Sequence, residues 1–170
     1  MNLPTNKQIL IAREFAEKAH APQNYDGHPY SKHLDDVYNI LLRFGFNEDD
    51  DLDLLIAAYL HDIIEDTATS YKDLKNMFGL DVAEIVYCMT DELGRNRKEK
   101  KDKTYPKIRS NMRSIILKLA DRIANVENSK DKISNFGSMY SKEFDDFQKQ
   151  LRIHAHVPTM WEHLTNLFKS

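Results

Sequence analysis

The residues best suited to chemistry follow directly on an apolar run. Leu54 to Leu60 are all apolar, and His61, Asp62, Glu65 and Asp66 come next. On a helix at roughly 100° per residue, these four polar side chains fall within an arc of about 140°. Three carboxylates at the end of a buried helix are costly to desolvate, and they oppose the helix dipole. A divalent metal ion is the simplest compensation, so the sequence predicts a metal site here.

Two further segments carry candidate metal or substrate contacts. The predicted helix 113–128 is apolar around most of its circumference, apart from one polar wedge of roughly 100°. The wedge consists of Ser114, Lys118, Asp121, Arg122 and Asn125. Upstream, His33 lies at the start of another predicted helix, after the Pro29-Tyr30 turn. Taken alone, the wedge is either a solvated face or the wall of a polar site, and His33 is either bonded to backbone or a metal ligand.

Helix patterns that must position these residues fill most of the chain. Thr5 and Gln8 have the spacing of a capping box before an apolar-periodic run through Ala19. The other predicted helices span about 31–45, 52–66, 70–79, 81–90, 113–128, 141–153 and 157–168. Ala21 to Tyr30 is predicted to be a loop, and no segment has the alternation of a β-strand. We therefore expect an all-α fold, a single helical domain of about seven or eight helices.

The composition excludes several classes of protein. The chain has 170 residues, a net charge of −3 and one cysteine, Cys88. One cysteine cannot form an internal disulfide, and its apolar neighbours predict a buried thiol in a reducing compartment, so we expect a cytoplasmic location. The longest apolar run is too short to span a bilayer, so we expect no membrane partner. A disulfide scaffold, a membrane protein and a disordered chain are excluded.

Charge is distributed unevenly along the chain. Residues 95–109 hold eight Lys or Arg against two Asp or Glu, a net charge of +6, whereas the rest of the chain carries −9. The near-neutral total argues against binding a long nucleic acid, and no aromatic residue is interleaved with these lysines before Tyr105. The basic stretch is a solvated helix face, a nucleic-acid patch or a surface that attracts phosphate groups.

Several motifs occur in one order and together resemble a known family. They are Phe15-Ala16 with Ala19-His20, Gly27-His28-Pro29-Tyr30 with His33, Ala57-Ala58-Tyr59-Leu60-His61-Asp62-Ile63-Ile64-Glu65-Asp66-Thr67, Thr90-Asp91, and Lys118-Leu119-Ala120-Asp121-Arg122 with Asn125. The series His33, His61-Asp62, Asp121 resembles the signature of HD-superfamily metal-dependent phosphohydrolases. The surrounding residues are most similar to the hydrolase domain of the RelA/SpoT group and its small stand-alone Mesh1-type relatives. The resemblance covers about residues 9–126 of one expected HD hydrolase domain, 1–170, and the C-terminal helices of about 129–170 match less distinctively.

The resemblance implies a metal centre and a catalytic pair. In such enzymes His33, His61, Asp62 and Asp121 would bind one ion, usually Mn²⁺. Two imidazoles and two carboxylates suit Mn, Fe, Co or Zn better than calcium, so another divalent transition metal would also fit. Glu65 and Asp66 would orient or deprotonate a metal-activated water and manage the proton to the leaving group.

The resemblance also implies the substrate, a small-molecule nucleotide. The family reaction removes the 3′-pyrophosphate of guanosine tetra- or pentaphosphate, (p)ppGpp. The expected substrate contacts are Lys98 and Lys101 to phosphates, Lys118 to a phosphate or a ligand carboxylate, and Asn125 to the ribose. The loop 23–27 lacks the Arg-Lys pair with which the family holds the guanine base, and Tyr25 is the candidate that stacks on a base instead.

This departure keeps a second function open. An HD phosphatase could act on another nucleotide, such as the 2′-phosphate of NADPH or a nucleoside 5′-monophosphate. A third interpretation, a non-catalytic nucleotide or RNA binder, would use the basic stretch and would need neither Glu65 nor Asp66. The sequence carries no signal for an oligomeric state.

Overall fold

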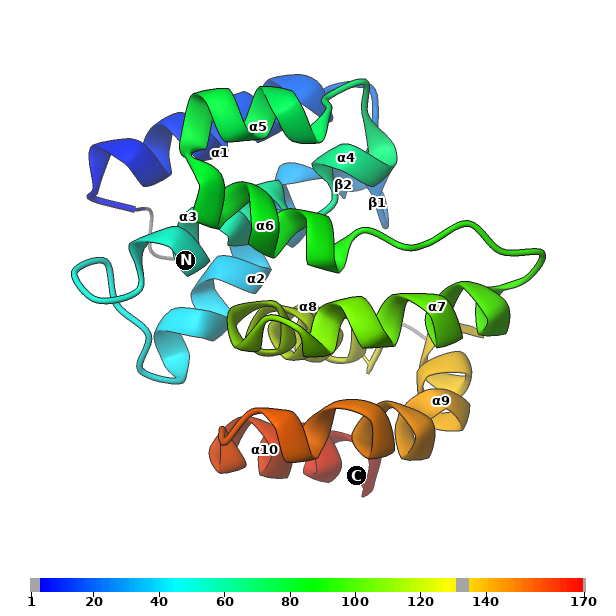
Figure 1. Ribbon diagram of the computed structural model, residues 1–170. Helices are drawn as coiled ribbons and strands as arrows, with labels where there is room; N and C mark the ends of the chain where they lie inside the picture. The colour runs from blue at the N-terminus through cyan, green and yellow to red at the C-terminus, as the bar shows by residue number, and fades with distance from the viewer. Residues whose placement is uncertain (1–3, 131–134, 170) are drawn as a thin grey trace.

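The apolar run forms the central helix. In the computed structural model, which describes residues 4–130 and 135–169, helix α3 spans Leu52–Leu60 and buries every side chain from Leu54 onward. A helix that is apolar all round must be covered on all sides. The cover comes from α1 (Lys7–Ala19), α2 (Ser31–Arg43), α6 (Leu80–Met89) and α8 (Met112–Lys130), all in contact with α3 (Figure 1).

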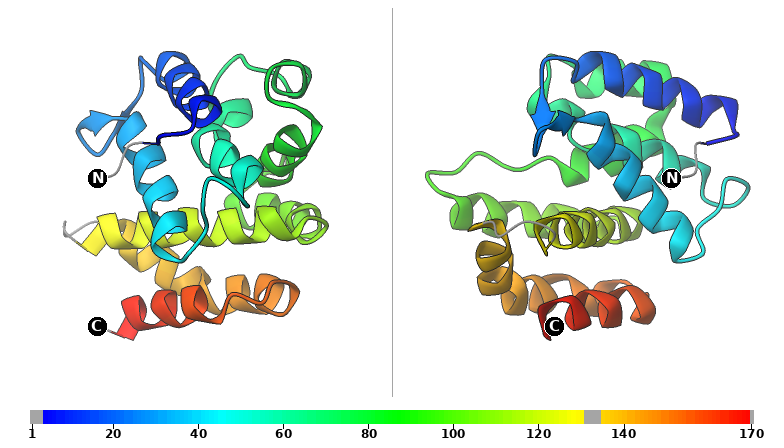
Figure 2. Two further views of the ribbon diagram at one scale, coloured as in Figure 1. Left: turned by 90° about the vertical axis from the view of Figure 1, so that its left-hand side faces the viewer. Right: turned by 180° about the vertical axis from the view of Figure 1, so that it is seen from behind.

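Helix α8 packs against both the N-terminal and the C-terminal helices. Besides α2, α3 and α6, it contacts α7 (Arg97–Arg109), α9 (Asn135–Leu151) and α10 (Pro158–Lys169). Figure 2 shows α8 crossing the middle of the molecule, with α2 on one side and α10 on the other. A short 3₁₀ turn, Arg152–His154, connects α9 to α10. The expected all-α helical bundle is confirmed.

The chain turns at the His-Asp pair. One continuous helix over 52–66 was predicted, and this is wrong, because α3 ends at Leu60 and a single helical turn, α4 (Ile63–Asp66), follows. The backbone carbonyl of Asp62 accepts bonds from the amides of Glu65 and Asp66 at 3.1 and 2.9 Å, so Asp62 starts the new turn. Glu65 and Asp66 therefore belong to this single turn and not to the end of α3, so the dipole of the long helix predicted over 52–66 does not act on them.

A two-stranded hairpin occupies the segment predicted to be loop. Strands β1 (Asn24–Tyr25) and β2 (His28–Pro29) pair antiparallel, with Tyr25 opposite His28. The two turn residues, Asp26 and Gly27, have φ values of 53° and 82°. Positive φ at both positions is what a type I′ turn requires, and Asp-Gly is a preferred pair for it. The hairpin lies beside α4 and leads directly into α2 (Figure 1).

The starts of two helices differ from the prediction, and one further helix is absent from the predicted set. Asn6, not Thr5, caps α1 by accepting a bond from the Gln8 amide, while the Thr5 hydroxyl donates to Glu48 at 2.7 Å. The basic stretch forms helix α7, capped by Asn96. Helix α9 begins before the predicted residue 141, and residues 131–134 of the predicted C-terminal region lie outside the described part of the chain.

Helix α5 and the buried thiol agree with the sequence. Ser70 and Asp73 form a capping box at the start of α5 (Tyr71–Phe78), and Cys88 is free and buried. In the part of the chain that the structure describes, no helix is long and apolar enough to cross a bilayer.

We predict that Leu55→Ala lowers the free energy of unfolding by about 3 kcal/mol, because it opens a cavity in the fully buried α3. Leu93→Ala is the control, since Leu93 is 87% exposed; its effect should stay below about 0.5 kcal/mol. Urea unfolding followed by circular dichroism measures both, and equal effects would contradict the central position of α3.

Candidate metal centre and active site

The four predicted metal ligands converge from three separate segments. His33 lies in the first turn of α2, His61 and Asp62 form the turn between α3 and α4, and Asp121 lies in the middle of α8. His61 Nε2 is 2.9 Å from Asp62 Oδ2. His33 Nε2 is 3.4 Å from Asp121 Oδ1 and 3.9 Å from Asp62 Oδ2. Both imidazoles therefore face both carboxylates.

The protonation pattern of His61 fits a metal ligand. Its Nδ1 lies 2.8 Å from the Ala58 carbonyl, which fixes the proton on that nitrogen. Its Nε2 is buried and lies 2.9 Å from Asp62 Oδ2, so this nitrogen is directed into the cluster. His33, His61 and Asp62 each offer one ligand atom, and these atoms lie within 4.8 Å of one another. Such a nitrogen and oxygen donor set suits a divalent transition metal.

The pKa values show how strongly the cluster attracts positive charge. Burial lowers the pKa of His61, but Asp62 and Asp121 raise it, and the outcome is about 9. Burial also works against the charged form of Asp62, yet His61 holds the pKa of that carboxyl below its usual range. A divalent cation would supply the same neutralisation and displace the imidazole protons.

Neighbouring side chains hold the two ligand carboxylates. The Tyr30 hydroxyl donates to Asp62 Oδ2 at 2.5 Å. Asn125 Nδ2 donates to Asp121 Oδ1 at 2.5 Å and to the Asp121 carbonyl at 3.0 Å. Lys118 Nζ donates to Asp121 Oδ2 at 3.0 Å. The orientation of both aspartates is thus set before any ligand arrives.

The predicted catalytic pair lies in the same cavity. Glu65 and Asp66 line it together with the predicted metal ligands His33, Asp62 and Asp121. Glu65 Oε2 accepts a bond from the Asp91 amide at 3.1 Å, and the Asp66 carbonyl accepts one from Gln23 Nε2 at 2.8 Å. Partial burial, together with nearby acidic groups, raises the pKa of both carboxyls. A raised pKa suits a group that exchanges protons near neutral pH.

Basic groups line the same cavity, which has a volume of about 210 Å³. They are Arg97, Lys101, Lys118 and Arg122. Lys101 Nζ lies 2.9 Å from Asp91 Oδ1, and Arg97 pairs with Glu143. Arg122 is buried over the Tyr140 ring, and its Nη1 has no hydrogen-bond partner among the described residues. That nitrogen is an available donor for an anionic ligand.

The polar wedge of α8 therefore faces the interior. Ser114, Asp121 and Arg122 are all buried, which rules out the solvated-face interpretation. Of the substrate contacts expected from the sequence, the structure brings Tyr25, Lys101, Lys118 and Asn125 to the cavity. It does not bring Lys98 there, because the Lys98 side chain is 82% exposed and pairs with Asp102.

Sequence reasoning missed Tyr30, Asp91 and Arg122 as site residues. All three lie inside segments that carry the family resemblance, so the motifs include these residues but do not say what each of them does. The Asp26-Gly27 pair was a direct signal for the hairpin that places Tyr25.

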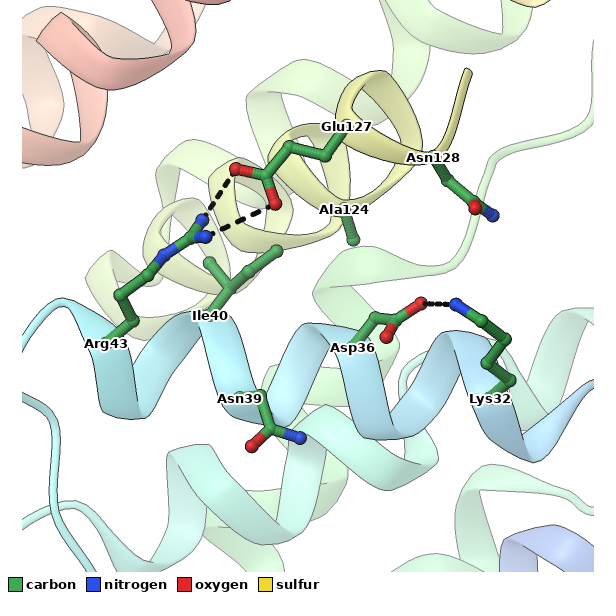
Figure 3. Close-up of a pocket in the computed structure, with 8 residues that line it drawn as sticks. All are labelled: Lys32, Asp36, Asn39, Ile40, Arg43, Ala124, Glu127 and Asn128. Atoms are coloured by element: carbon green, nitrogen blue, oxygen red, sulfur yellow. Dashed lines mark hydrogen bonds and ion pairs between the residues drawn. The ribbon is translucent and has the colours of Figure 1, made fainter. Parts of the chain in front are cut away.

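A second polar hollow, between α2 and α8, is a poor candidate for the active site (Figure 3). It is lined by Lys32, Asp36, Arg43 and Glu127 among others, and none of the predicted site residues is in it. Its charges pair with one another: Lys32 with Asp36 at 2.6 Å, and Arg43 with Glu127 at 2.7 Å.

Comparison with known proteins identifies the family. The family model described as HD domain matches residues 12–146, the segment that contains the four clustered ligands. The chain belongs to the HD domain family. This confirms the resemblance drawn from the motifs.

Named relatives and a solved structure agree with this membership. Guanosine-3′,5′-bis(diphosphate) 3′-pyrophosphohydrolase MESH1 of Danio rerio is 33% identical over 131 residues, covering 74% of this chain and 71% of the relative. The guanosine-3′,5′-bis(diphosphate) 3′-pyrophosphohydrolase of Aquifex aeolicus is 36% identical over 127 residues, 71% of this chain. This chain spans only 18% of that longer relative. A solved structure of a metazoan ortholog of SpoT that hydrolyzes ppGpp has the same fold, with a TM-score of 0.81, 23% identity and coverage of 99% of this chain and 97% of the other.

We predict that Asp62→Ala abolishes stoichiometric metal binding, because it removes one of the ligand atoms and leaves two imidazoles facing a single aspartate. Elemental analysis of the protein after incubation with Mn²⁺ and desalting measures this. Asp36→Ala is the matched control, since Asp36 pairs with Lys32 in the hollow of Figure 3. Full metal content in Asp62→Ala would disprove the coordination.

Proposed function

We propose that this protein hydrolyses the 3′-pyrophosphate of guanosine tetra- or pentaphosphate with the help of a divalent cation, Mn²⁺ in particular. The observation that carries the proposal is the cavity that joins a two-histidine, two-aspartate cluster to two further carboxylates and four basic side chains. Support also comes from the names of the Danio rerio and Aquifex aeolicus relatives, which carry this activity.

His33, His61, Asp62 and Asp121 would hold the cation. When bound, such an ion lowers the pKa of water and polarises a phosphoryl oxygen. Glu65 orients the attacking water and accepts its proton, which its raised pKa favours. Asp66, whose pKa is also raised, returns a proton to the 3′-oxygen as the bond from that oxygen to phosphorus breaks. The products are inorganic pyrophosphate and a nucleotide with a free 3′-hydroxyl.

The basic side chains of the cavity would bind the phosphates. Arg122 offers the unpaired Nη1, and Lys101 and Lys118 bring two ammonium groups near the carboxylates. These positive charges offset the repulsion between an anionic substrate and the acidic cluster. A small nucleotide is the proposed partner rather than a long nucleic acid, because Arg95, Lys98 and Lys103 on the exposed side of the basic stretch pair with Glu99 and Asp102.

A second candidate is an HD phosphatase acting on another nucleotide, and one observation favours it. An adjoining cavity of about 330 Å³ shares Tyr25, Asn125 and Tyr140 with the active site. Among the described residues no Lys or Arg lines it, whereas the family that the sequence resembles has an Arg in the loop corresponding to residues 23–27 that helps to hold guanine. Base selectivity in this chain would depend on Asp26 and on neutral groups such as Tyr25 and Asn125.

The location is also a proposal. The free, buried Cys88 is what a reducing compartment would leave intact, and we propose that the protein is cytoplasmic.

Substrate profiling with identified products tests the function. The purified protein is incubated with Mn²⁺ and, separately, with ppGpp, NADPH and a set of nucleoside 5′-monophosphates. Pyrophosphate released from ppGpp supports the first proposal, and orthophosphate released from another nucleotide supports the second. Nucleotide binding with no product from any of them would favour the non-catalytic binder.

We predict that Lys101→Ala raises KM about tenfold and changes kcat less than about threefold, because one cation near the phosphates is lost. The effect should be largest at low ionic strength. Lys98→Ala is the matched control from the same helix and should change KM less than about twofold, since an exposed ion pair contributes little. Equal effects of the two variants would contradict the placement of Lys101.

We predict that Glu65→Gln lowers kcat at least about 100-fold, because the amide cannot accept a proton. Metal content should stay that of the wild type, since Glu65 is not one of the four ligands. Glu17→Gln on the exposed side of α1 controls for general effects of the change. Steady-state kinetics and elemental analysis of the same samples separate catalysis from metal loss; unchanged kcat would remove Glu65 from the mechanism.

A further inference from the structure

The two histidines of the metal cluster are held in different ways. His61 donates its Nδ1 hydrogen to the Ala58 carbonyl, as metal-binding histidines usually do to fix their ring. His33 Nδ1 is equally buried, but it has no hydrogen-bond partner among the described residues. Some other contact must therefore fix the plane of the His33 imidazole.

Two tyrosine rings pack against that imidazole. The ring of Tyr25 stacks on His33, with centroids 4.7 Å apart and planes 26° from parallel. Tyr30 meets His33 edge-on at 5.7 Å. Stacked rings with this separation attract one another and restrict rotation about the side-chain bonds. The face of Tyr25 that packs on His33 is no longer available to a nucleobase.

The hydroxyl of Tyr25 reaches a second ligand through one intermediate. It donates to Asn125 Oδ1 at 2.8 Å, and Asn125 Nδ2 donates in turn to Asp121 Oδ1 at 2.5 Å. The amide oxygen and nitrogen of Asn125 are both engaged, which fixes the orientation of its side chain. Tyr25 thus contacts the proposed ligand His33 directly and holds Asn125, which in turn holds the proposed ligand Asp121.

The hairpin makes this placement possible. Tyr25 pairs with His28 in the two-stranded sheet, next to the tight Asp26-Gly27 turn. Tyrosine has few rotatable bonds, so a short, well-defined strand is sufficient to aim its ring. In the family that the sequence resembles, this segment carries an Arg-Lys pair, which is absent here. The role inferred for Tyr25 is therefore specific to this chain.

We propose that Tyr25 is a positioning residue of the metal centre, whose ring fixes His33 and whose hydroxyl fixes Asp121 through Asn125. The inference rests on the metal centre of the proposed function, but not on the identity of the substrate. It adds a second role to Tyr25, beside the expected contact with a base.

Metal affinity without nucleotide tests the proposal. Free Mn²⁺ is titrated by electron paramagnetic resonance into the wild type, Tyr25→Leu and Tyr25→Phe. Tyr25→Leu should weaken Mn²⁺ binding about tenfold, the lower end of what losing a supporting contact of a metal ligand costs. Tyr25→Phe keeps the stacked ring and loses only the hydroxyl, so it should restore most of the affinity. Asn24→Ala on the same hairpin should bind Mn²⁺ like the wild type.

The outcomes separate this inference from the proposed function. Wild-type Mn²⁺ affinity in Tyr25→Leu, with a raised KM for the nucleotide, would overturn the inference and assign Tyr25 to the base. A wild type that binds no Mn²⁺ would overturn the metal centre and the inference together. Weakened binding in Tyr25→Leu supports the inference even if ppGpp is not the substrate. If Tyr25→Leu does not fold, Tyr25→Thr, whose β-branched side chain suits a strand, takes its place: Mn²⁺ binding weaker than that of Tyr25→Phe supports the role of the ring, and affinity equal to that of Tyr25→Phe overturns it.

Discussion

The structure depends on keeping two buried carboxylates next to each other. Asp62 and Asp121 come from segments almost 60 positions apart in the chain, and both face His33 and His61. Like charges in a poorly solvated site repel strongly unless cations intervene. Lys118 and the imidazoles supply positive charge to this arrangement, and a divalent ion would supply more. The buried Nε2 of His61, the hydroxyl of Tyr30 and the amide of Asn125 all face one of these two carboxylates.

The apolar helices serve to place these groups. Leu117, Leu119, Ala120 and Ile123 on α8 are buried, so the helix cannot rotate and Asp121 is held toward the cluster. Helix α3 delivers His61 from an apolar interior, and the turn at Asp62 then brings Glu65 and Asp66 to the cavity. Packing thus determines the direction of each functional side chain, and the chemistry depends on that direction.

The sequence predicted those parts of the site that lie in recognisable motifs and missed those that depend on hydrogen bonds and packing. The four residues that cluster were predicted because each stands in a short motif with neighbours that carry the resemblance. The turn at His61-Asp62 was missed because the apolar pattern continues through Ile63 and Ile64, and periodicity cannot register a break that hydrogen bonding decides. The hairpin strands have two residues each, too few for an alternation to appear. Lys98 and Lys101 are one helical turn apart, and only the structure separates them: Lys101 is buried against Asp91, from the loop before α7, whereas Lys98 is exposed and pairs with Asp102.

The basic stretch 95–109 is largely neutralised by ion pairs in the folded protein. Most cations of the stretch 95–109 already have acidic partners, so its net charge of +6 is not an open positive field. Arg97 and Lys101 reach the cavity paired with Glu143 and Asp91. A phosphate that binds there must replace those carboxylates, and an exchange of partners gains less energy than pairing with a free cation. Tight binding then requires several phosphates acting together, which favours a nucleotide with clustered phosphates over a monophosphate.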